Sequence, residues 1–168
     1  MMQSRTHNCG ELRLTDAGKA VTIVGWMENV REVGANFAFV VLRDFYGTTQ
    51  VVIETEEMMK AVKGLNKEST ISVTGLVRER ESKNTKIPTG EIEVVPTEIK
   101  VLGKCKNVLP FEVATSTNTG EDVRLKYRFL DLRNPRVHNH ILLRSEIVSF
   151  LRSKMEGMGF HEINTPIL

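Results

Sequence analysis

Residues 25–53 are the part of the sequence that says most about the fold, because three short apolar runs follow one another there with breaks between them. The runs are rich in β-branched and aromatic side chains, and the breaks fall at Gly34 and at Tyr46-Gly47. Each run is too short for a typical helix but has the length and composition of a strand. The segment therefore predicts three consecutive strands joined as a meander.

The second run, residues 37–42, has two apolar faces, because side chains alternate along a strand. One face carries the aliphatic side chains of Ala38, Val40 and Leu42. The other face carries the rings of Phe37 and Phe39. We expect the aliphatic face to point into the core and the aromatic face to point outward.

The third run adds an amide to this outer face, since Gln50 shares a face of its strand with Thr48 and Val52. A nucleobase offers a flat surface for stacking and an edge of donors and acceptors, and proteins recognise unstacked single-stranded RNA through both. The sequence therefore indicates a base-binding surface. The alternative is that Phe37 and Phe39 pack beneath a loop, because single surface apolar residues are common.

The composition of the 168-residue chain limits how such a surface would work. The chain has 23 Lys and Arg residues against 21 Asp and Glu residues, so affinity for a nucleic acid has to come from a local patch. Cys9 and Cys105 are far apart in sequence, which indicates neither a disulfide framework nor a metal site. No apolar run approaches the roughly 20 residues of a membrane helix. We expect a soluble, cytoplasmic protein.

Two more strands are predicted after a short helix at residues 54–63. In the strand at residues 70–81, Arg78 and Arg80 share the face opposite the apolar side chains. In the strand at residues 91–95, Glu93 alternates with apolar neighbours, and a further apolar run at residues 99–102 closes this part.

Five strands with a helix after the third, within about a hundred residues, match the Greek-key barrel called the OB-fold. Such barrels bind oligonucleotides on strands two and three and on the loops between strands one and two and between strands four and five. Arg31 is expected in the first of these loops, and Lys83 and Asn84 in the second. The alternative for the second loop is a solvated hairpin tip. The predicted fold class is mainly β.

The remainder of the chain has a different character. Residues 103–120 lack periodicity and indicate a linker, residues 121–132 have a helical pattern, and Asn134-Pro135 favours the start of a new helix. A long helix is predicted from Pro135 to Gly159, with an apolar stripe so broad that another surface has to cover it.

Three segments together resemble the bacterial-type aspartyl-tRNA synthetases, which are class II enzymes. They are residues 5–13 with Gly25-Trp26, residues 125–133, and the long helix with the residues from Gly159 to Leu168 that follow it. The resemblance implies an OB-fold anticodon-binding domain at residues 1–104, a hinge region at 105–134, and the truncated start of the catalytic domain at 135–168.

The resemblance also implies roles for individual residues in binding the anticodon stem-loop of tRNA(Asp). Phe39 corresponds to the ring that stacks on the middle base, and Gln50 to the amide that contacts its edge. The other implied tRNA contacts are Arg31 and Glu93 at the first base, Asn84 in the loop near the third base, and the basic positions Arg78, Arg80 and Lys83.

For the complete enzyme, the resemblance implies activation of aspartate by ATP with Mg²⁺, transfer to tRNA, and a homodimer formed through motif 1, with Phe160, Ile163 and Pro166 at the interface. We expect this fragment to contain no catalytic residue and to bind no cofactor, metal, membrane or DNA. The alternatives are a stand-alone OB module that binds single strands without distinguishing bases, and the same region of a lysyl- or asparaginyl-tRNA synthetase.

Overall fold

The computed structural model describes residues 4–166 of the chain and divides it into two compact units, residues 1–109 and residues 110–168. Each unit has buried residues of its own. The first unit holds the larger hydrophobic cluster, and the second buries Phe111, Val113, Leu130 and Val137.

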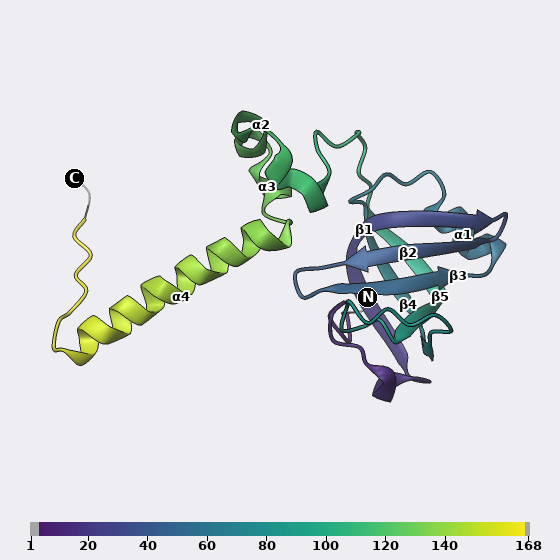
Figure 1. The fold of residues 1–168 in the computed structure, drawn as a ribbon, viewed down its shortest axis with the longest axis horizontal. Coiled ribbons are helices and arrows are strands. Elements are labelled where there is room, and N and C mark those ends of the chain that lie inside the picture. The colour runs from purple at the N-terminus through teal and green to yellow at the C-terminus, as the bar shows by residue number, and fades with distance from the viewer. Residues whose placement is uncertain (1–3, 167–168) are drawn as a thin grey trace. The chain divides into compact units, whose positions relative to one another are not determined.

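The first unit is a closed barrel of five strands in the order β1-β2-β3-β5-β4 (Figure 1). The strands are β1 (Ala20–Gly34), β2 (Phe37–Arg43), β3 (Thr48–Ile53), β4 (Thr70–Glu79) and β5 (Ile92–Gly103). Neighbouring strands are antiparallel except β3 and β5, which pair in parallel. The helix α1 (Glu56–Val62) follows β3 and buries Met59 and Val62. This arrangement confirms the OB-fold that the sequence predicts.

The core of the barrel follows the predicted alternation. Ala38, Val40 and Leu42 of β2 are fully buried, while Phe37 and Phe39 are only partly buried. The other apolar barrel side chains with 0% exposure come from the remaining four strands and from the amino-terminal segment: Cys9, Leu12, Ile23, Val51, Ile53, Ile71, Val73, Ile92 and Val94. The segment before β1, which includes a short 3-10 helix η1 (Leu14–Asp16), therefore contributes to the same core.

Two strands are longer than the sequence pattern predicts. β1 continues to Gly34, so Arg31 lies in a strand opposite Phe39 and not in a loop. The separate runs at residues 91–95 and 99–102 form one strand, because the β4–β5 register shifts between Thr74 and Gly75 and admits Pro96 within the strand. A Cβ atom at Gly75 would overlap the backbone carbonyl of Val95, so the close approach at this bulge requires glycine.

The second unit is helical and contains η2 (Val113–Asn118), α2 (Glu121–Lys126), α3 (Arg128–Asp131) and α4 (Pro135–Gly157). The single helix expected at residues 121–132 is divided at Tyr127, whose φ of −112° and ψ of 43° interrupt the helical backbone. Pro135 occupies the first turn of α4 as predicted.

The side chain of Asn134 connects α4 to the start of this unit. Its Oδ1 accepts a hydrogen bond from the backbone N–H of Arg136 at 2.9 Å and thereby caps the helix. Its Nδ2 donates to the carbonyl oxygens of Val113 at 2.9 Å and Ala114 at 3.1 Å. Residues that the sequence indicated as linker therefore form part of a folded unit.

Asp131 is the buried ionic centre of the second unit, with a side chain that is 0% exposed. It accepts hydrogen bonds from Ser116 Oγ at 2.8 Å, Arg124 Nε at 3.1 Å and Arg128 Nη1 at 2.6 Å. Burial alone would raise the pKa of Asp131, but the hydrogen bonds from Arg124 and Ser116 and the charges of Arg124 and Arg128 hold it below its ordinary value.

The helix α4 exposes most of its apolar side chains. The consecutive residues Ile141, Leu142 and Leu143 point in different directions around the helix, and all three are more than 40% exposed. Within α4, Val137 is the one residue that is buried in the described part of the chain. None of the helices formed by residues 4–166 has the length and apolar character needed to cross a membrane.

Candidate nucleic-acid interface

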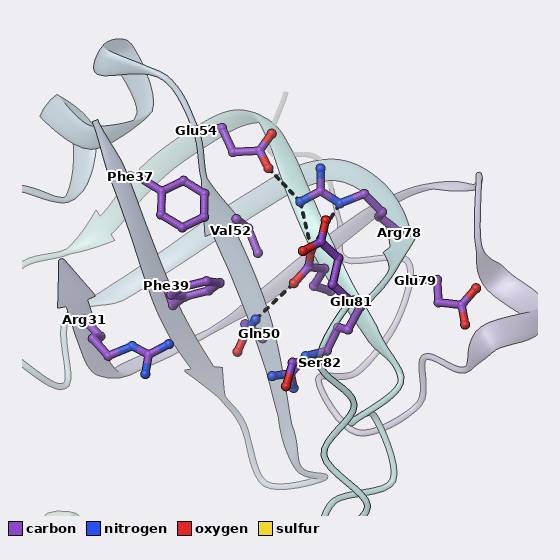
Figure 2. A pocket seen from close by; sticks show the side chains of 12 residues that line it. Arg31, Phe37, Phe39, Gln50, Val52, Glu54, Arg78, Glu79, Glu81 and Ser82 are labelled. Carbon is purple, nitrogen blue, oxygen red and sulfur yellow. Dashed lines mark hydrogen bonds and ion pairs between the residues drawn. The ribbon is translucent and has the colours of Figure 1, made fainter. Parts of the chain in front are cut away.

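A groove of about 600 Å³ lies on the outer surface of the barrel (Figure 2). Its lining comes from all five strands, from the residue that follows β3 and from the start of the β4–β5 loop: Arg31, Phe37, Phe39, Gln50, Val52, Glu54, Arg78, Glu79, Arg80, Glu81, Ser82 and Glu93. Of the residues predicted to contact tRNA, the groove brings together Phe39, Gln50, Arg31, Glu93, Arg78 and Arg80. Lys83 and Asn84 are outside this lining.

The aromatic part of the groove is formed by Phe37 and Phe39, whose rings both project from the outer face of β2 (Figure 2). The ring centroids are 5.1 Å apart and the ring planes are 86° apart, an edge-to-face contact. The guanidinium carbon of Arg31 lies 4.9 Å from the Phe39 centroid. The ring of Phe39 is therefore held on the barrel surface by contacts with Arg31 of β1 and Phe37 of β2, outside the core.

The polar part of the groove is a chain of four side chains, three from strands β3, β4 and β5 and one from the residue that follows β3 (Figure 2). Nε2 of Gln50 donates to Glu93 Oε2 at 3.0 Å. Nε and Nη2 of Arg78 donate to Glu93 Oε1 at 3.1 and 2.8 Å, and Nη2 also donates to Glu54 Oε1 at 2.6 Å. The strand register explains the contact at the centre, because Arg78 and Glu93 lie opposite each other on β4 and β5.

Burial differs along this chain. Glu93 is only 6% exposed, whereas the side chain of Arg78 is 46% exposed and that of Glu54 is 37% exposed. The hydrogen bonds that Arg78 makes to Glu54 and Glu93 raise its pKa above the ordinary value, because both favour the charged guanidinium. The charge of the buried carboxylate of Glu93 is thus neutralised by the guanidinium of Arg78, which is itself accessible to solvent.

The groove as a whole carries no excess of positive charge. Its lining contains three arginines and four glutamates. A surface that binds mainly phosphates would have more cations than anions. The combination of rings, an amide and nearly balanced charge suits a nucleobase that stacks on the rings and forms hydrogen bonds with the amide, while the phosphates of the strand remain outside the groove.

The predicted residues Lys83 and Asn84 lie in the β4–β5 loop, as expected. Nζ of Lys83 is 2.8 Å from Glu79 Oε1 and 3.6 Å from Glu91 Oε1, so two carboxylates already surround its charge. Oδ1 of Asn84 accepts from the backbone N–H of Lys86 at 3.1 Å, which makes it a turn-forming residue of the loop.

Sequence reasoning missed Glu54 as part of this groove. The signal was present, because Gln50, Val52 and Glu54 are spaced two apart and therefore continue one face of β3 past its last residue. The sequence pattern instead predicts that Glu54 begins the following helix, which in the structure begins at Glu56.

The residues predicted for the dimer interface lie in the second unit, at and after the end of α4. Phe160 borders a mostly apolar hollow of about 370 Å³ together with Val148, Leu151 and Met155. Ile163 is 80% exposed, and Pro166 is also exposed. Among residues 4–166, no group of three or more His, Cys, Asp or Glu side chains is arranged to hold a metal ion.

Comparison with known protein families agrees with both units. The sequence model of OB-fold nucleic acid binding domains matches residues 21–102. The model of class II tRNA synthetases of the D, K and N group matches residues 120–168. The order of the two matches is the order of the barrel and the helical unit along the chain.

Curated relatives resemble the whole chain. An aspartate–tRNA ligase of Streptomyces coelicolor is 45% identical over 100% of this chain and 29% of its own length. An aspartate–tRNA(Asp/Asn) ligase of Pelagibacter ubique is 44% identical over 100% of this chain and 28% of its own length. The chain therefore spans somewhat less than a third of the length of these relatives.

Solved structures give the same result. A putative aspartyl-tRNA synthetase of Leishmania major superposes with a TM-score of 0.87 at 25% identity, covering 99% of this chain and 36% of that chain. The asparaginyl-tRNA synthetase of Pyrococcus horikoshii superposes with a TM-score of 0.79 at 26% identity, covering 99% of this chain and 37% of that chain. The curated aspartate–tRNA ligases are 44–45% identical to this chain, against 26% for the asparaginyl enzyme, and this difference favours the aspartyl assignment. The chain therefore belongs with the aspartate–tRNA ligases, as the counterpart of their OB-fold domain and of the first part of their class II synthetase domain.

Proposed function

We propose that the barrel binds the anticodon loop of tRNA(Asp), and that the chain is part of a cytoplasmic enzyme that joins aspartate to this tRNA. The observation that carries the proposal is the groove that Phe39 and Gln50 line together, as diagonal neighbours on the paired strands β2 and β3. The family of the chain and the names of its relatives support the same assignment.

In this proposal, the anticodon bases leave their stack and enter the groove separately. The middle base stacks on Phe39, and the amide of Gln50 forms hydrogen bonds with its edge. Arg31 and Glu93 are close enough to these two residues to contact the first base, and Asn84 in the β4–β5 loop contacts the third. Such use of stacking and edge contacts is how proteins recognise single-stranded RNA loops.

The catalytic part of the proposal rests on family membership alone. The complete enzyme would activate aspartate with ATP, assisted by Mg²⁺, to form aspartyl-adenylate, and would then transfer the aspartyl group to the tRNA. None of the described residues is assigned to ATP or Mg²⁺. The function of this region is to select the tRNA that receives the amino acid.

Self-association is the second partner proposal, and it is favoured by the surface of α4. Eleven large apolar residues from Ile141 to Ile163 are exposed. Apolar surfaces of this extent are rarely left in contact with water. A second copy of the chain, paired through α4 and the segment with Phe160, Ile163 and Pro166, would cover part of it.

The test is a titration of the chain with two RNA stem-loops that share a stem and differ only in the loop. One loop carries the aspartate anticodon GUC, and the other carries the same bases in scrambled order. The expected result is clear preference for the first loop at every salt concentration. Equal affinities with the same salt dependence would instead identify a barrel that coats single strands without distinguishing their bases.

A further inference from the structure

We propose that Glu54 is a specificity-determining residue that acts at a distance: through Arg78 and Glu93 it fixes which atom of the Gln50 amide faces the bound base. This inference rests on the proposed function, because it assigns a role in base selection within the same groove. Glu54 stands at the end of a chain of hydrogen bonds that leads to Gln50 (Figure 2).

The first step concerns the amide of Gln50. A glutamine amide presents an acceptor on one side and two donors on the other, and rotation by half a turn exchanges them. An ionised carboxylate is an acceptor only, so Glu93 holds the Nε2 side of Gln50 toward itself at 3.0 Å. Figure 2 shows the amide oxygen of Gln50 on the side away from the dashed line that marks the hydrogen bond of Nε2. Gln50 therefore presents its amide oxygen to the groove as a hydrogen-bond acceptor at a fixed position, with the second N–H of Nε2 beside it as a donor.

This orientation matters for the choice of base. Uracil, the middle base of the aspartate anticodon, presents an N–H donor between two carbonyl acceptors, and an oriented amide can accept from the first and donate to one of the others. Cytosine has no hydrogen on the corresponding ring nitrogen, which would then face the amide oxygen. If the amide rotated, this discrimination would be reduced, because the donor side would suit the acceptor nitrogen of cytosine.

The second step concerns Glu93. The carboxylate is 6% exposed, and a buried carboxylate is stable only when it is paired and hydrogen-bonded. Arg78 supplies this pairing, since its Nε and Nη2 both donate to Oε1 of Glu93. Because Arg78 occupies Oε1, Oε2 is left to Gln50.

The third step brings in Glu54. The side chain of Arg78 is 46% exposed, so contact with Glu93 alone would leave the guanidinium able to turn toward solvent or toward an RNA phosphate. Glu54 Oε1 accepts from Nη2 at 2.6 Å, so this nitrogen is shared between Glu54, which follows β3, and Glu93 of β5, the strand between β3 and β4. With Nη2 bound to both carboxylates and Nε bound to Glu93, Arg78 remains in the orientation that keeps Glu93 and Gln50 in position.

The experiment is a double-mutant cycle on the whole chain with four proteins: the unmodified chain, Glu54→Gln, Gln50→Ala and the double variant. Two stem-loops are compared that differ only in uracil or cytosine as the middle base. The measured quantity is the dissociation constant of the cytosine loop divided by that of the uracil loop. We expect Glu54→Gln to lower this ratio by about three- to tenfold, the size of one orienting hydrogen bond. In the Gln50→Ala background the same change is expected to leave the ratio as it is, because there is no amide to orient.

The matched control is Glu57→Gln. Glu57 is an exposed residue of α1 outside the groove lining, and its substitution removes the same charge from the same region of the barrel. If Glu54 acted only by repelling RNA, both substitutions would raise the affinity for the two loops equally and leave the ratio unchanged. That result overturns the inference, and so does a ratio that Glu54→Gln lowers even without Gln50.

The outcomes also separate this inference from the proposed function. An unmodified chain that does not distinguish the two loops removes the proposed function, and the inference with it. An unmodified chain that distinguishes them, together with a Glu54→Gln variant that does so equally well, removes only the inference. Because Glu54 is 37% exposed, we expect the variant to fold, and circular dichroism of each protein checks this.

Discussion

The guanidinium carbon of Arg31 lies 4.9 Å from the centroid of the Phe39 ring, across the pairing of β1 and β2. A cation over a ring face is a favourable contact, and it places a planar donor group directly beside a stacking surface. The ring of Phe37 meets Phe39 nearly at right angles, with 86° between the planes. Phe39 is therefore fixed in orientation before any base arrives, which lowers the entropy lost on binding.

Substitution of Phe39 by alanine is expected to weaken binding of the aspartate anticodon stem-loop by about 1–3 kcal/mol, the usual contribution of one base stacked on an aromatic ring. Isothermal titration measures the change. The control is Phe45→Ala, which removes a 52% exposed ring that does not line the groove. An unchanged affinity in the Phe39 variant would exclude this ring from the binding site.

Substitution of Gln50 by alanine is expected to relax the preference for the middle base more than it lowers the overall affinity. The reason is that contacts to base edges carry the specificity, whereas contacts to phosphates set position and most of the affinity. Titration with four loops, one for each middle base, measures both quantities. Equal loss on all four loops would show that Gln50 contributes packing and not recognition.

The salt dependence of stem-loop binding is expected to be shallow. The groove lining contains three arginines and four glutamates, and Lys83 beside it is paired with Glu79 and Glu91. With about two phosphates neutralised, the slope of log affinity against log salt would be roughly −1.4, since each phosphate on a single strand contributes about −0.7. A slope several times steeper would mean that binding depends on a basic surface elsewhere.

Substitution of Asp131 by asparagine is expected to destabilise the helical unit by about 2 kcal/mol at neutral pH, because hydrogen bonds to charged groups are lost in a buried site. The pKa of Asp131 is lowered in the folded protein, so its contribution is present above the unfolded-state value of about 3.9 and is lost as the pH falls through the folded-state value.

Urea unfolding followed by the helical signal at several pH values measures this effect. The unmodified chain should lose helical stability on acidification, and the Asp131→Asn variant should lose less of it. Glu146→Gln, at an exposed position on α4, is the control and should retain the behaviour of the unmodified chain. Parallel pH profiles for all three proteins would contradict the assigned role of Asp131.

Self-association through α4 is expected to depend on its exposed apolar side chains. Leu151 is 54% exposed and borders the hollow that also contains Phe160. Leu151→Glu should therefore shift the chain toward a monomer in sedimentation equilibrium, while Ser145→Glu, which adds the same charge elsewhere on the helix, should shift it less. A chain that is already monomeric with α4 fully ordered and solvated would count against the interface.

The barrel and most of its groove could be predicted because they follow from local patterns. Alternation along β2 and β3 places Ala38 and Val40 inside and Phe39 and Gln50 outside, and the structure agrees at each position. Alternation involves neighbouring residues only, so it is visible without knowing how strands pair.

The features that could not be predicted depend on pairing between distant segments. The ion pairs of Arg78 require its register opposite Glu93 and the approach of Glu54 from the end of β3. The position of Arg31 within a strand depends on how far β1 pairs with β2. Asp131 gains its partners from η2 and α2, and no periodicity in the sequence indicates that these segments meet.

The parallel pairing of β3 and β5 has a consequence for the fidelity of the proposed enzyme. Its registered pair, Val51 and Val94, consists of the direct chain neighbours of Gln50 and Glu93. The seam that closes the barrel therefore also sets the spacing of the two side chains that would discriminate between bases. A conservative substitution at Val51 or Val94 that loosens the β3–β5 pairing would change this spacing while the barrel still folds. Selection of the tRNA would then become less accurate before the domain itself unfolds.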